Sequence, residues 1–184
     1  MNALLKPSLA EFLGTFTLVF IGGLAGSVTN QTGSLLPAIA HGFILVAIIY
    51  SYGHISGAHV NPAVTAGLLV GGKVKIDRAI AYWIAQFAGA IVAAIVMSII
   101  LPPASLSPDY VGGAAAAQTK GSLTDTAVWS AALLEFFLTG LLVTTVYQTA
   151  VYEKVGNLAG LAIGFLHGLL ITFFQLPSFI VTLA

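Results

Sequence analysis

The chain alternates between long apolar runs and short polar connections, and this alternation predicts helices that cross a membrane. A hydrocarbon core about 30 Å thick needs roughly 20 mainly apolar residues in a helix. Five runs approach this length, and they cover residues 9–29, 36–55, 79–101, 128–150 and 158–176. We therefore predict an all-α membrane protein with five transmembrane helices.

One further apolar run is too short to cross. Residues 61–70 (NPAVTAGLLV) lie between the second and third spans and are followed by a basic stretch, 73–78. Asn is a favoured N-cap and Pro suits the first helical position, so Asn61 and Pro62 predict the start of a half-helix. Because this half-helix cannot reach the other face, we predict that it enters and leaves on one side. Such a re-entrant segment is tolerated where protein buries it or water lines it.

The composition agrees with a membrane protein and excludes several other classes. Of the 184 residues, 58% are hydrophobic and 7% are charged, whereas ordinary soluble domains carry roughly 25% charged residues. The formal net charge is zero, and no basic stripe suggests a nucleic-acid partner. The absence of cysteine excludes disulfides, thiolate catalysis and Cys-based zinc sites. We expect no cofactor and no metal.

The basic residues predict the orientation in the membrane. If the N-terminus is cytoplasmic, then Lys6, the stretch 73–78 and Lys154 lie inside and only Lys120 lies outside. The positive-inside rule favours this arrangement. It puts the half-helix on the cytoplasmic side and, after five crossings, the C-terminus on the opposite side. We expect a multi-pass protein of the cell membrane.

Segments of the first half recur in the second half. LAEFLGTFTLVF (9–20) resembles LLEFFLTGLLVTTV (133–146), and AIAHGF (38–43) resembles LAIGF (161–165). These pairs have offsets of 124 and 122 positions, which suggests one repeat with a small deletion.

The repeat predicts how the chain is organised. Three spans in each copy would invert the second copy relative to the first, which is an architecture of transporters and channels. We predict a first repeat at 1–101, a connecting loop at 102–127 outside the membrane, and an incomplete second repeat at 128–184.

The residues before the half-helix suit a pore for a neutral solute. The run Gly57, Ala58, His59 and Val60 is irregular, and its carbonyls would form a ladder of hydrogen-bond acceptors. The free N–H groups and the dipole of the half-helix would create positive potential near the midplane, and Asn61 would add a side-chain donor. Acceptors followed by a donor suit water, and the positive end opposes protons and cations.

The segment SGAHVNPAVT (56–65) resembles the first Asn-Pro-Ala box of the aquaporin, or major intrinsic protein, family, with Asn61, Pro62 and Ala63 as the box. The segment IAQFAGAIVAA (84–94) and the paired Glu-Phe segments are also similar, so the resemblance covers about residues 8–172. It implies an aquaporin-like inverted-repeat bundle of six spans and two half-helices, usually a homotetramer with one pore per subunit.

The 184 residues depart from the family pattern near their end. They contain no second Asn-Pro-Ala box, no filter Arg and no sixth span. We therefore expect five transmembrane helices plus one re-entrant half-helix, with the second half-helix and sixth span missing.

The resemblance also implies roles for single residues. Glu11 and Glu135 would be buried and would hold the re-entrant loops, with snorkelling at a membrane face as the alternative. His41 and Ile171 would line the outer selectivity filter, with a structural role bonded to a neighbouring carbonyl as the alternative for His41. His with Ile resembles the filters of plant vacuolar-membrane aquaporins, which often admit ammonia or hydrogen peroxide besides water. His167 is interpreted as structural.

The leading functional hypothesis is a passive transmembrane channel for water, or another small neutral solute such as ammonia or hydrogen peroxide, in the lipid bilayer. The alternative is a truncated, non-conducting membrane protein derived from an aquaporin. An enzyme is disfavoured, because the sequence shows no metal-ligand spacing such as His-Glu-x-x-His and no Ser/His or paired-Asp arrangement.

Overall fold

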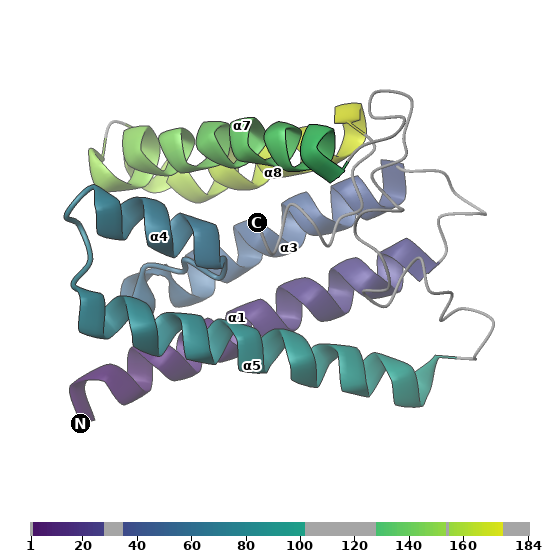
Figure 1. Ribbon diagram of the computed structural model, residues 1–184, viewed down its shortest axis with the longest axis horizontal. Coiled ribbons are helices and arrows are strands. Elements are labelled where there is room, and N and C mark those ends of the chain that lie inside the picture. Colours follow the sequence, from purple (N-terminus) through teal and green to yellow (C-terminus); the bar gives the residue numbers. More distant parts are fainter. Residues whose placement is uncertain (1, 28–34, 102–127, 154, 175–184) are drawn as a thin grey trace.

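A computed structural model of the protein describes residues 2–27, 35–101, 128–153 and 155–174, and every regular element within these ranges is helical (Figure 1). The helices are α1 (Asn2–Ser27), α3 (Leu35–Ser56), α4 (Pro62–Val70), α5 (Ile76–Ile100), α7 (Val128–Val146) and α8 (Ala159–Phe174). A π-helical turn, Tyr147–Val151, follows α7, and a 3-10 turn, Gly156–Leu158, precedes α8.

Each of the five predicted spans overlaps one of the longer helices. Helices α1, α3 and α5 are long and apolar enough to cross a membrane, whereas the apolar helical stretches Phe136–Val151 and Gly156–Leu170 are shorter. The predicted connection at 102–127 and the tail from 175 onward lie outside the described residues. Helix α1 starts at Asn2, seven residues before the predicted span, and it includes Pro7, which has no N–H group to donate.

Helix α4 is a half-helix that does not cross the bundle. Its nine residues rise about 14 Å at 1.5 Å per residue, less than half of a hydrocarbon core. Its N-terminus lies in the middle of the bundle, and its C-terminus lies at the end where α5 begins (Figure 1). Gly72 turns the chain there with a positive φ of 69°, which glycine adopts without strain. The chain therefore enters and leaves at the same end of the bundle.

Glycines bring the backbones of neighbouring helices into direct contact. Helix α1 packs against α3 and α5, and α3 packs against α8. A Cβ atom on Gly89 of α5 would lie 2.4 Å from the carbonyl oxygen of Phe12. Between α3 and α8, a Cβ on Gly42 would lie 2.9 Å from the carbonyl oxygen of Gly164, and a Cβ on Gly164 would lie 2.6 Å from that of Gly42. Small residues at such positions are typical of helix packing in membranes.

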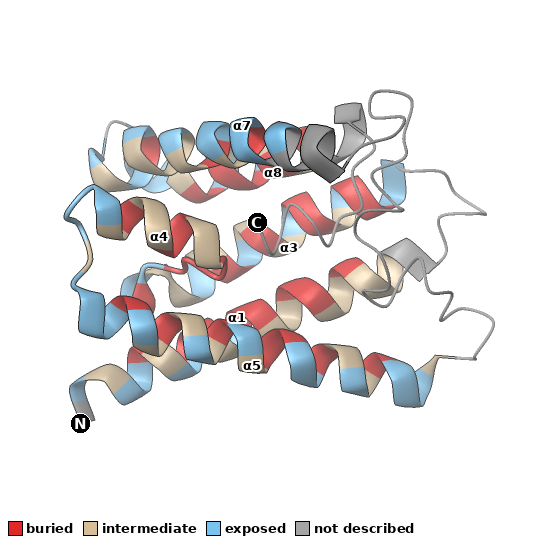
Figure 2. Cartoon of the chain, in the orientation of Figure 1, coloured by how far each residue is buried: buried red, intermediate tan, exposed pale blue. Residues whose placement is uncertain are grey.

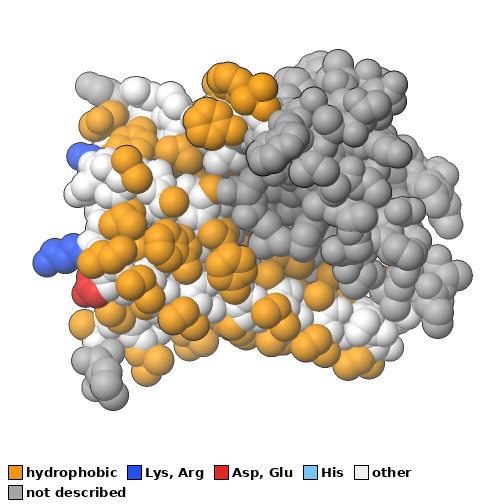
Figure 3. All heavy atoms as spheres, in the orientation of Figure 1, with side chains coloured by type: hydrophobic (Ala, Val, Ile, Leu, Met, Phe, Trp, Pro, Cys, Tyr) orange, Lys and Arg blue, Asp and Glu red, His pale blue; other side chains and the backbone are white. Residues whose placement is uncertain are grey.

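The surface of this bundle is unlike that of a soluble protein. Large apolar side chains cover much of the described surface (Figure 3), and Phe43, Phe136 and Phe165 are each more than 60% exposed. The buried residues (red in Figure 2) include ten with polar side chains: Glu11, Thr15, His41, Ser56, His59, Asn61, Thr65, Gln86, Thr149 and His167. An apolar surface, with polar side chains kept inside the bundle, suits a protein whose outer solvent is lipid.

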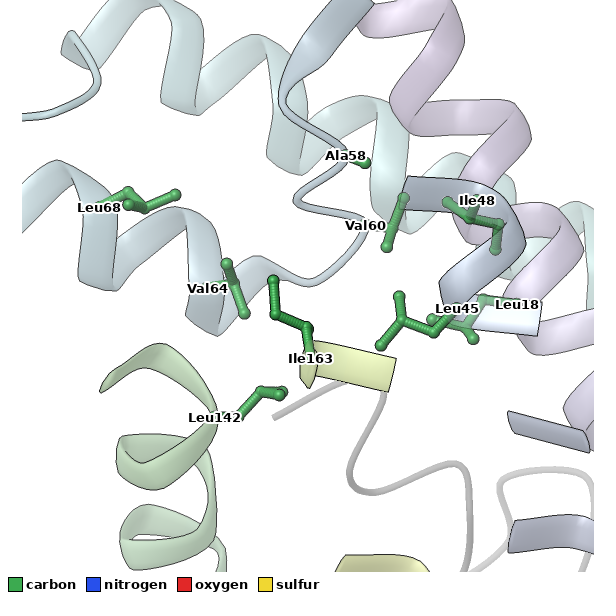
Figure 4. Packing of buried hydrophobic residues seen from close by; sticks show 9 residues of the cluster. All are labelled: Leu18, Leu45, Ile48, Ala58, Val60, Val64, Leu68, Leu142 and Ile163. Atoms are coloured by element: carbon green, nitrogen blue, oxygen red, sulfur yellow. The ribbon is translucent and has the colours of Figure 1, made fainter. Parts of the chain in front are cut away.

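A cluster of buried apolar side chains fixes α4 among the longer helices. Figure 4 shows these side chains converging from α1, α3, α4, α7, α8 and the segment 57–60. The members are Leu18, Leu45, Ile48, Ala58, Val60, Val64, Leu68, Leu142 and Ile163. At its other end α4 is tied to the π-helical turn, because the Tyr147 hydroxyl donates to the Gly67 carbonyl at 3.1 Å.

The contact between α3 and α8 predicts the effect of adding one methyl group. In the variant Gly164→Ala the new Cβ would meet the Gly42 carbonyl oxygen and push α8 away from α3. We expect the free energy of unfolding to fall by roughly 1–3 kcal/mol, measured by SDS-induced unfolding in mixed micelles followed by circular dichroism. The matched control is Gly140→Ala on α7, where nothing lies within 4 Å of the added Cβ. Equal effects of the two variants would contradict this packing.

Candidate functional site

The segment 57–60 leads from the end of α3 to the start of α4 and has an unusual backbone. Gly57, Ala58 and Val60 have positive φ angles of 92°, 47° and 40°. The left-handed conformation is uncommon for alanine and a clear outlier for β-branched valine, and it costs on the order of 1–3 kcal/mol per residue. Such a backbone persists only where the surrounding structure holds it.

The carboxylate of Glu11 on α1 supplies much of that support. Its side chain is 0% exposed, which excludes the snorkelling alternative for this residue. Oε1 accepts from the Ser56 hydroxyl at 2.6 Å and from the His59 amide at 2.9 Å. Oε2 accepts from the Val60 amide at 2.6 Å and from Nε2 of Gln86 at 2.8 Å. Four donors offset the cost of burying this carboxylate, and they fix two peptide planes of the segment.

The same hydrogen bonds decide where the carbonyl groups of the segment point. The amide of Ala58 donates to the Ser56 hydroxyl oxygen at 3.0 Å, and the next two amides donate to Glu11. In a trans peptide unit the C=O group points away from the N–H group of the following residue. The carbonyl oxygens of Gly57, Ala58 and His59 therefore point away from Ser56 and Glu11, and all three residues line a cavity.

Side chains of α5 hold the segment and the start of α4 from another side. The bonds run from the Tyr82 hydroxyl to the Ser56 carbonyl at 2.7 Å, from Trp83 Nε1 to the Pro62 carbonyl at 3.0 Å, and from Gln86 Nε2 to the Thr65 hydroxyl oxygen at 3.0 Å. None of these three α5 residues is among the site residues predicted from the sequence. The sequence contains one signal for such a role. Gln86 carries an amide side chain inside an apolar span, where it needs a hydrogen-bond partner.

Asn61 caps α4 with its side-chain oxygen. Oδ1 accepts from the amides of Ala63 at 2.7 Å and Val64 at 3.3 Å, and Pro62 occupies the first helical position, where no N–H group is needed. The expectation that the N–H groups here are free is wrong, because the cap uses two of them. The positive end of the helix dipole at Asn61 favours a negative or lone-pair atom. Asn61 is buried and lines the cavity.

The imidazole of His59 packs against α4 and α5. Its Nδ1 lies 3.1 Å from the Thr65 hydroxyl oxygen, and that hydroxyl donates to the Asn61 carbonyl, so Nδ1 is the donor in this pair. The ring stands edge-on to the ring of Tyr82, with centroids 5.0 Å apart. His59 therefore contributes its backbone carbonyl to the cavity.

A cavity of about 50 Å³ lies beside the segment 57–60. By this measure, the space that the centre of a water molecule can reach, one water needs roughly 10–15 Å³, so the cavity accommodates a short file of waters. The segment, Asn61 and His167 supply its polar groups. The other lining residues are Leu18, Leu45, Ile49, Val64, Leu142, Val146, Ala150 and Ile163. A few fixed polar groups on an apolar wall suit the binding of a small neutral molecule.

His41 lies on α3 and is 1% exposed. Its Nδ1 is 2.9 Å from the Pro37 carbonyl oxygen. A carbonyl only accepts, so Nδ1 carries the hydrogen and, in the neutral ring, Nε2 carries the lone pair. Gly22 of α1 leaves room for this ring, since a Cβ there would lie 1.9 Å from Nε2. The hydrogen bond to Pro37 keeps the structural alternative for His41 open.

Two predicted site residues cannot be compared with the structure at side-chain level. Glu135 falls within α7 and Ile171 within α8, but their side chains lie outside the described residues.

His167 of α8 is a cavity residue that the sequence alone suggests to be structural. It is 1% exposed, and its ring centroid lies 6.0 Å from that of His41, with the ring planes tilted by 41°. Among the described residues neither of its ring nitrogens has a hydrogen-bond partner. Leaving a buried polar group unpaired costs roughly 1–3 kcal/mol, so a structural role does not account for this side chain.

Known proteins resemble the chain along most of its length. Residues 1–177 match the family described as major intrinsic protein. "Probable aquaporin TIP1-1" from Oryza sativa subsp. japonica is 41% identical over 176 residues, and "Aquaporin TIP1-2" from Musa acuminata is 39% identical. Each match covers 89% of this chain and 66% of the relative. The chain belongs to the major intrinsic protein family. It spans just under two thirds of the length of these relatives.

A solved structure of the family has the same fold. The aquaglyceroporin from Plasmodium falciparum superposes with a TM-score of 0.72 at 24% sequence identity, covering 97% of this chain and 81% of that chain. The predicted fold class, an all-α membrane protein with an aquaporin-like bundle, is confirmed. The family membership predicted from the Asn-Pro-Ala box is confirmed as well.

The hydrogen bonds around Glu11 predict that replacing it with a side chain of equal size lowers the free energy of unfolding. Glu11→Gln keeps the size of the side chain but replaces one acceptor oxygen with a donor, which would face the Val60 or Gln86 N–H groups. We expect a loss of roughly 1–3 kcal/mol of unfolding free energy for each donor left without an acceptor, measured by thermal unfolding in detergent. Glu153→Gln is the control, because Glu153 is exposed. An unchanged unfolding temperature for Glu11→Gln would show that the carboxylate does not support the segment.

Proposed function

We propose that this chain forms a passive channel for water or another small neutral solute. The observation that carries this proposal is a cavity lined by Gly57, Ala58 and His59, whose carbonyls point away from Ser56 and Glu11, and by Asn61 at the N-terminus of α4. Relatives whose names describe them as aquaporins support the same function by likeness. The pair of His41 and Ile171 supports ammonia and hydrogen peroxide as further solutes.

The arrangement replaces the hydrogen bonds that a water molecule loses when it leaves bulk solvent. Water would donate to the carbonyls of Gly57, Ala58 and His59, and at the end of this ladder its oxygen would accept from the amide of Asn61. The positive end of the α4 dipole favours the water oxygen and opposes cations and protons. The apolar lining of the rest of the cavity holds the solute only weakly, which a channel requires for release.

Within this channel we assign roles by the contacts that the residues make. Glu11 supports the segment whose carbonyls face the solute, and Asn61, Pro62 and Ala63 form the start of the half-helix at the pore. By the repeat, Glu135 would do for a second re-entrant segment what Glu11 does for the first. His41 and Ile171 are assigned to the outer filter. A homotetramer is proposed from the family resemblance.

We also propose that residues 1–101 and 128–184 are two inverted repeats joined by 102–127. The sequence pairs Gly42 with Gly164, and these two residues approach each other reciprocally across the contact between α3 and α8. Reciprocal contact between equivalent positions is what a two-fold relation produces. Inverted repeats of this kind meet around the solute path.

The orientation with a cytoplasmic N-terminus follows from the basic residues and predicts a labelling pattern. The chain has no cysteine, so a single introduced cysteine reports its own side of the membrane. In cells treated with a membrane-impermeant maleimide, Lys75→Cys should react only after permeabilisation, because the connection between α4 and α5 would be cytoplasmic. Lys120→Cys, outside the described residues, is the opposite-side control and should react in intact cells. The reverse pattern would contradict the orientation.

Conduction is tested by stopped-flow shrinkage of proteoliposomes that contain the 184-residue chain. Asn61→Asp keeps the oxygen that caps α4 but replaces the N–H₂ donor with a charged oxygen. We expect the water permeability of this variant to fall about tenfold, which corresponds to about 1.4 kcal/mol on the barrier. Mercury salts should not block the wild type, because they act through thiolates and the chain has none.

The matched control for the conduction experiment is Asn157→Asp. Asn157 is exposed, and the hydrogen bond that it accepts from Tyr50 goes to its backbone carbonyl, so the control should conduct like the wild type. Wild-type permeability equal to that of empty liposomes would favour the non-conducting alternative. Permeability that Asn61→Asp leaves unchanged would remove Asn61 from the pore.

A further inference from the structure

The cavity has one polar side chain on the wall contributed by α8. Ile163 and His167 lie one helical turn apart and both line the cavity, but only His167 carries hydrogen-bonding atoms there. Helices α3 and α8 run in opposite directions (Figure 1), and His167 contacts His41 of α3 ring to ring. His167 therefore marks the end of the cavity that is nearest His41.

The imidazole of His167 has hydrogen-bonding capacity that the described residues do not use. A neutral imidazole offers one N–H donor and one acceptor nitrogen. Within the described part of the chain neither nitrogen has a partner, although the side chain is 1% exposed. By contrast, His41 and His59 each place Nδ1 on a protein oxygen. Buried polar groups are normally paired with protein or water, so the partner of His167 is expected to come from the cavity.

The cavity defines the chemistry of that partner. The segment 57–60 lines it and has carbonyl acceptors on the side opposite Glu11, and His167 adds an acceptor and a donor on α8. A molecule that bonds both the carbonyls and the acceptor nitrogen of His167 needs at least two hydrogen-bond donors. It must also be small, because the cavity measures about 50 Å³. Water meets both conditions.

We propose that His167 is a solute-binding and specificity-determining residue of the channel, which holds a small molecule with two hydrogen-bond donors against the carbonyls of the segment 57–60. This inference rests on the channel function proposed above. The solute binds His167 beside His41 and then moves to the carbonyl groups of the segment 57–60, which lead to Asn61. Replacing the imidazole with an apolar side chain removes one hydrogen bond from each passing molecule.

The first experiment measures water permeability of three variants in proteoliposomes. His167→Leu should lower the permeability roughly two- to tenfold, the factor that one hydrogen bond is worth. His167→Gln keeps a donor and an acceptor and should recover most of the wild-type value. The matched control is His54→Leu, because His54 is exposed and does not line the cavity. Wild-type permeability in His167→Leu, or a loss in His167→Gln as large as in His167→Leu, would overturn the proposal.

The second experiment detects water at His167 without requiring conduction. Solid-state NMR of the ¹⁵N-histidine-labelled chain in bilayers would transfer magnetisation from water protons to the imidazole nitrogens. We expect a water-contacted signal that disappears in His167→Gln, which identifies it among the four histidines. If this signal is present but the chain does not conduct, the channel function fails and the solute contact stands. If the chain conducts without this signal, the inference on His167 is overturned and the channel function stands.

Discussion

The buried carboxylate of Glu11 is the contact on which the rest of the site depends. It accepts hydrogen bonds from the end of α3, from two amides of the segment 57–60 and from Gln86 of α5. The two peptide planes that it holds turn their carbonyls away from it, and the segment requires backbone angles that alanine and valine adopt only under strain. In an apolar bundle a carboxylate is stable only with such partners. Glu11 and the segment 57–60 therefore stabilise each other.

The half-helix has a different kind of support at each end. At its beginning, Asn61 uses its oxygen as the cap, and Trp83 bonds the Pro62 carbonyl. At its end, Tyr147 bonds the Gly67 carbonyl from the π-helical turn. Between these ends the apolar cluster shown in Figure 4 fills one side of α4. These contacts hold the Asn61 amide at the cavity, where a solute would meet it.

Much of this molecule could be predicted from the sequence, because its strongest signals are local. Apolar runs predict the five long helices, and Asn61 followed by Pro62 predicts the start of the half-helix to the residue. Tyr82 and Trp83 were not predictable as partners of the segment, because aromatic residues inside a span are ordinary and their targets are backbone carbonyls 21 or more residues away. The two backbone amides that the Asn61 oxygen caps were also expected to be free, and only the structure shows them paired.

The role of His167 could not be predicted from the sequence. A lone histidine in an apolar helix is compatible with a structural role, and nothing near it in the sequence decides otherwise. The tertiary structure places it beside His41 and on the cavity wall, with neither ring nitrogen bonded by the described residues. The sequence by itself determined which segments are helical, where the short helix begins and which family the chain belongs to, because these depend on local patterns. Only the tertiary structure decided which polar groups share the cavity, because that depends on contacts between helices far apart in the chain.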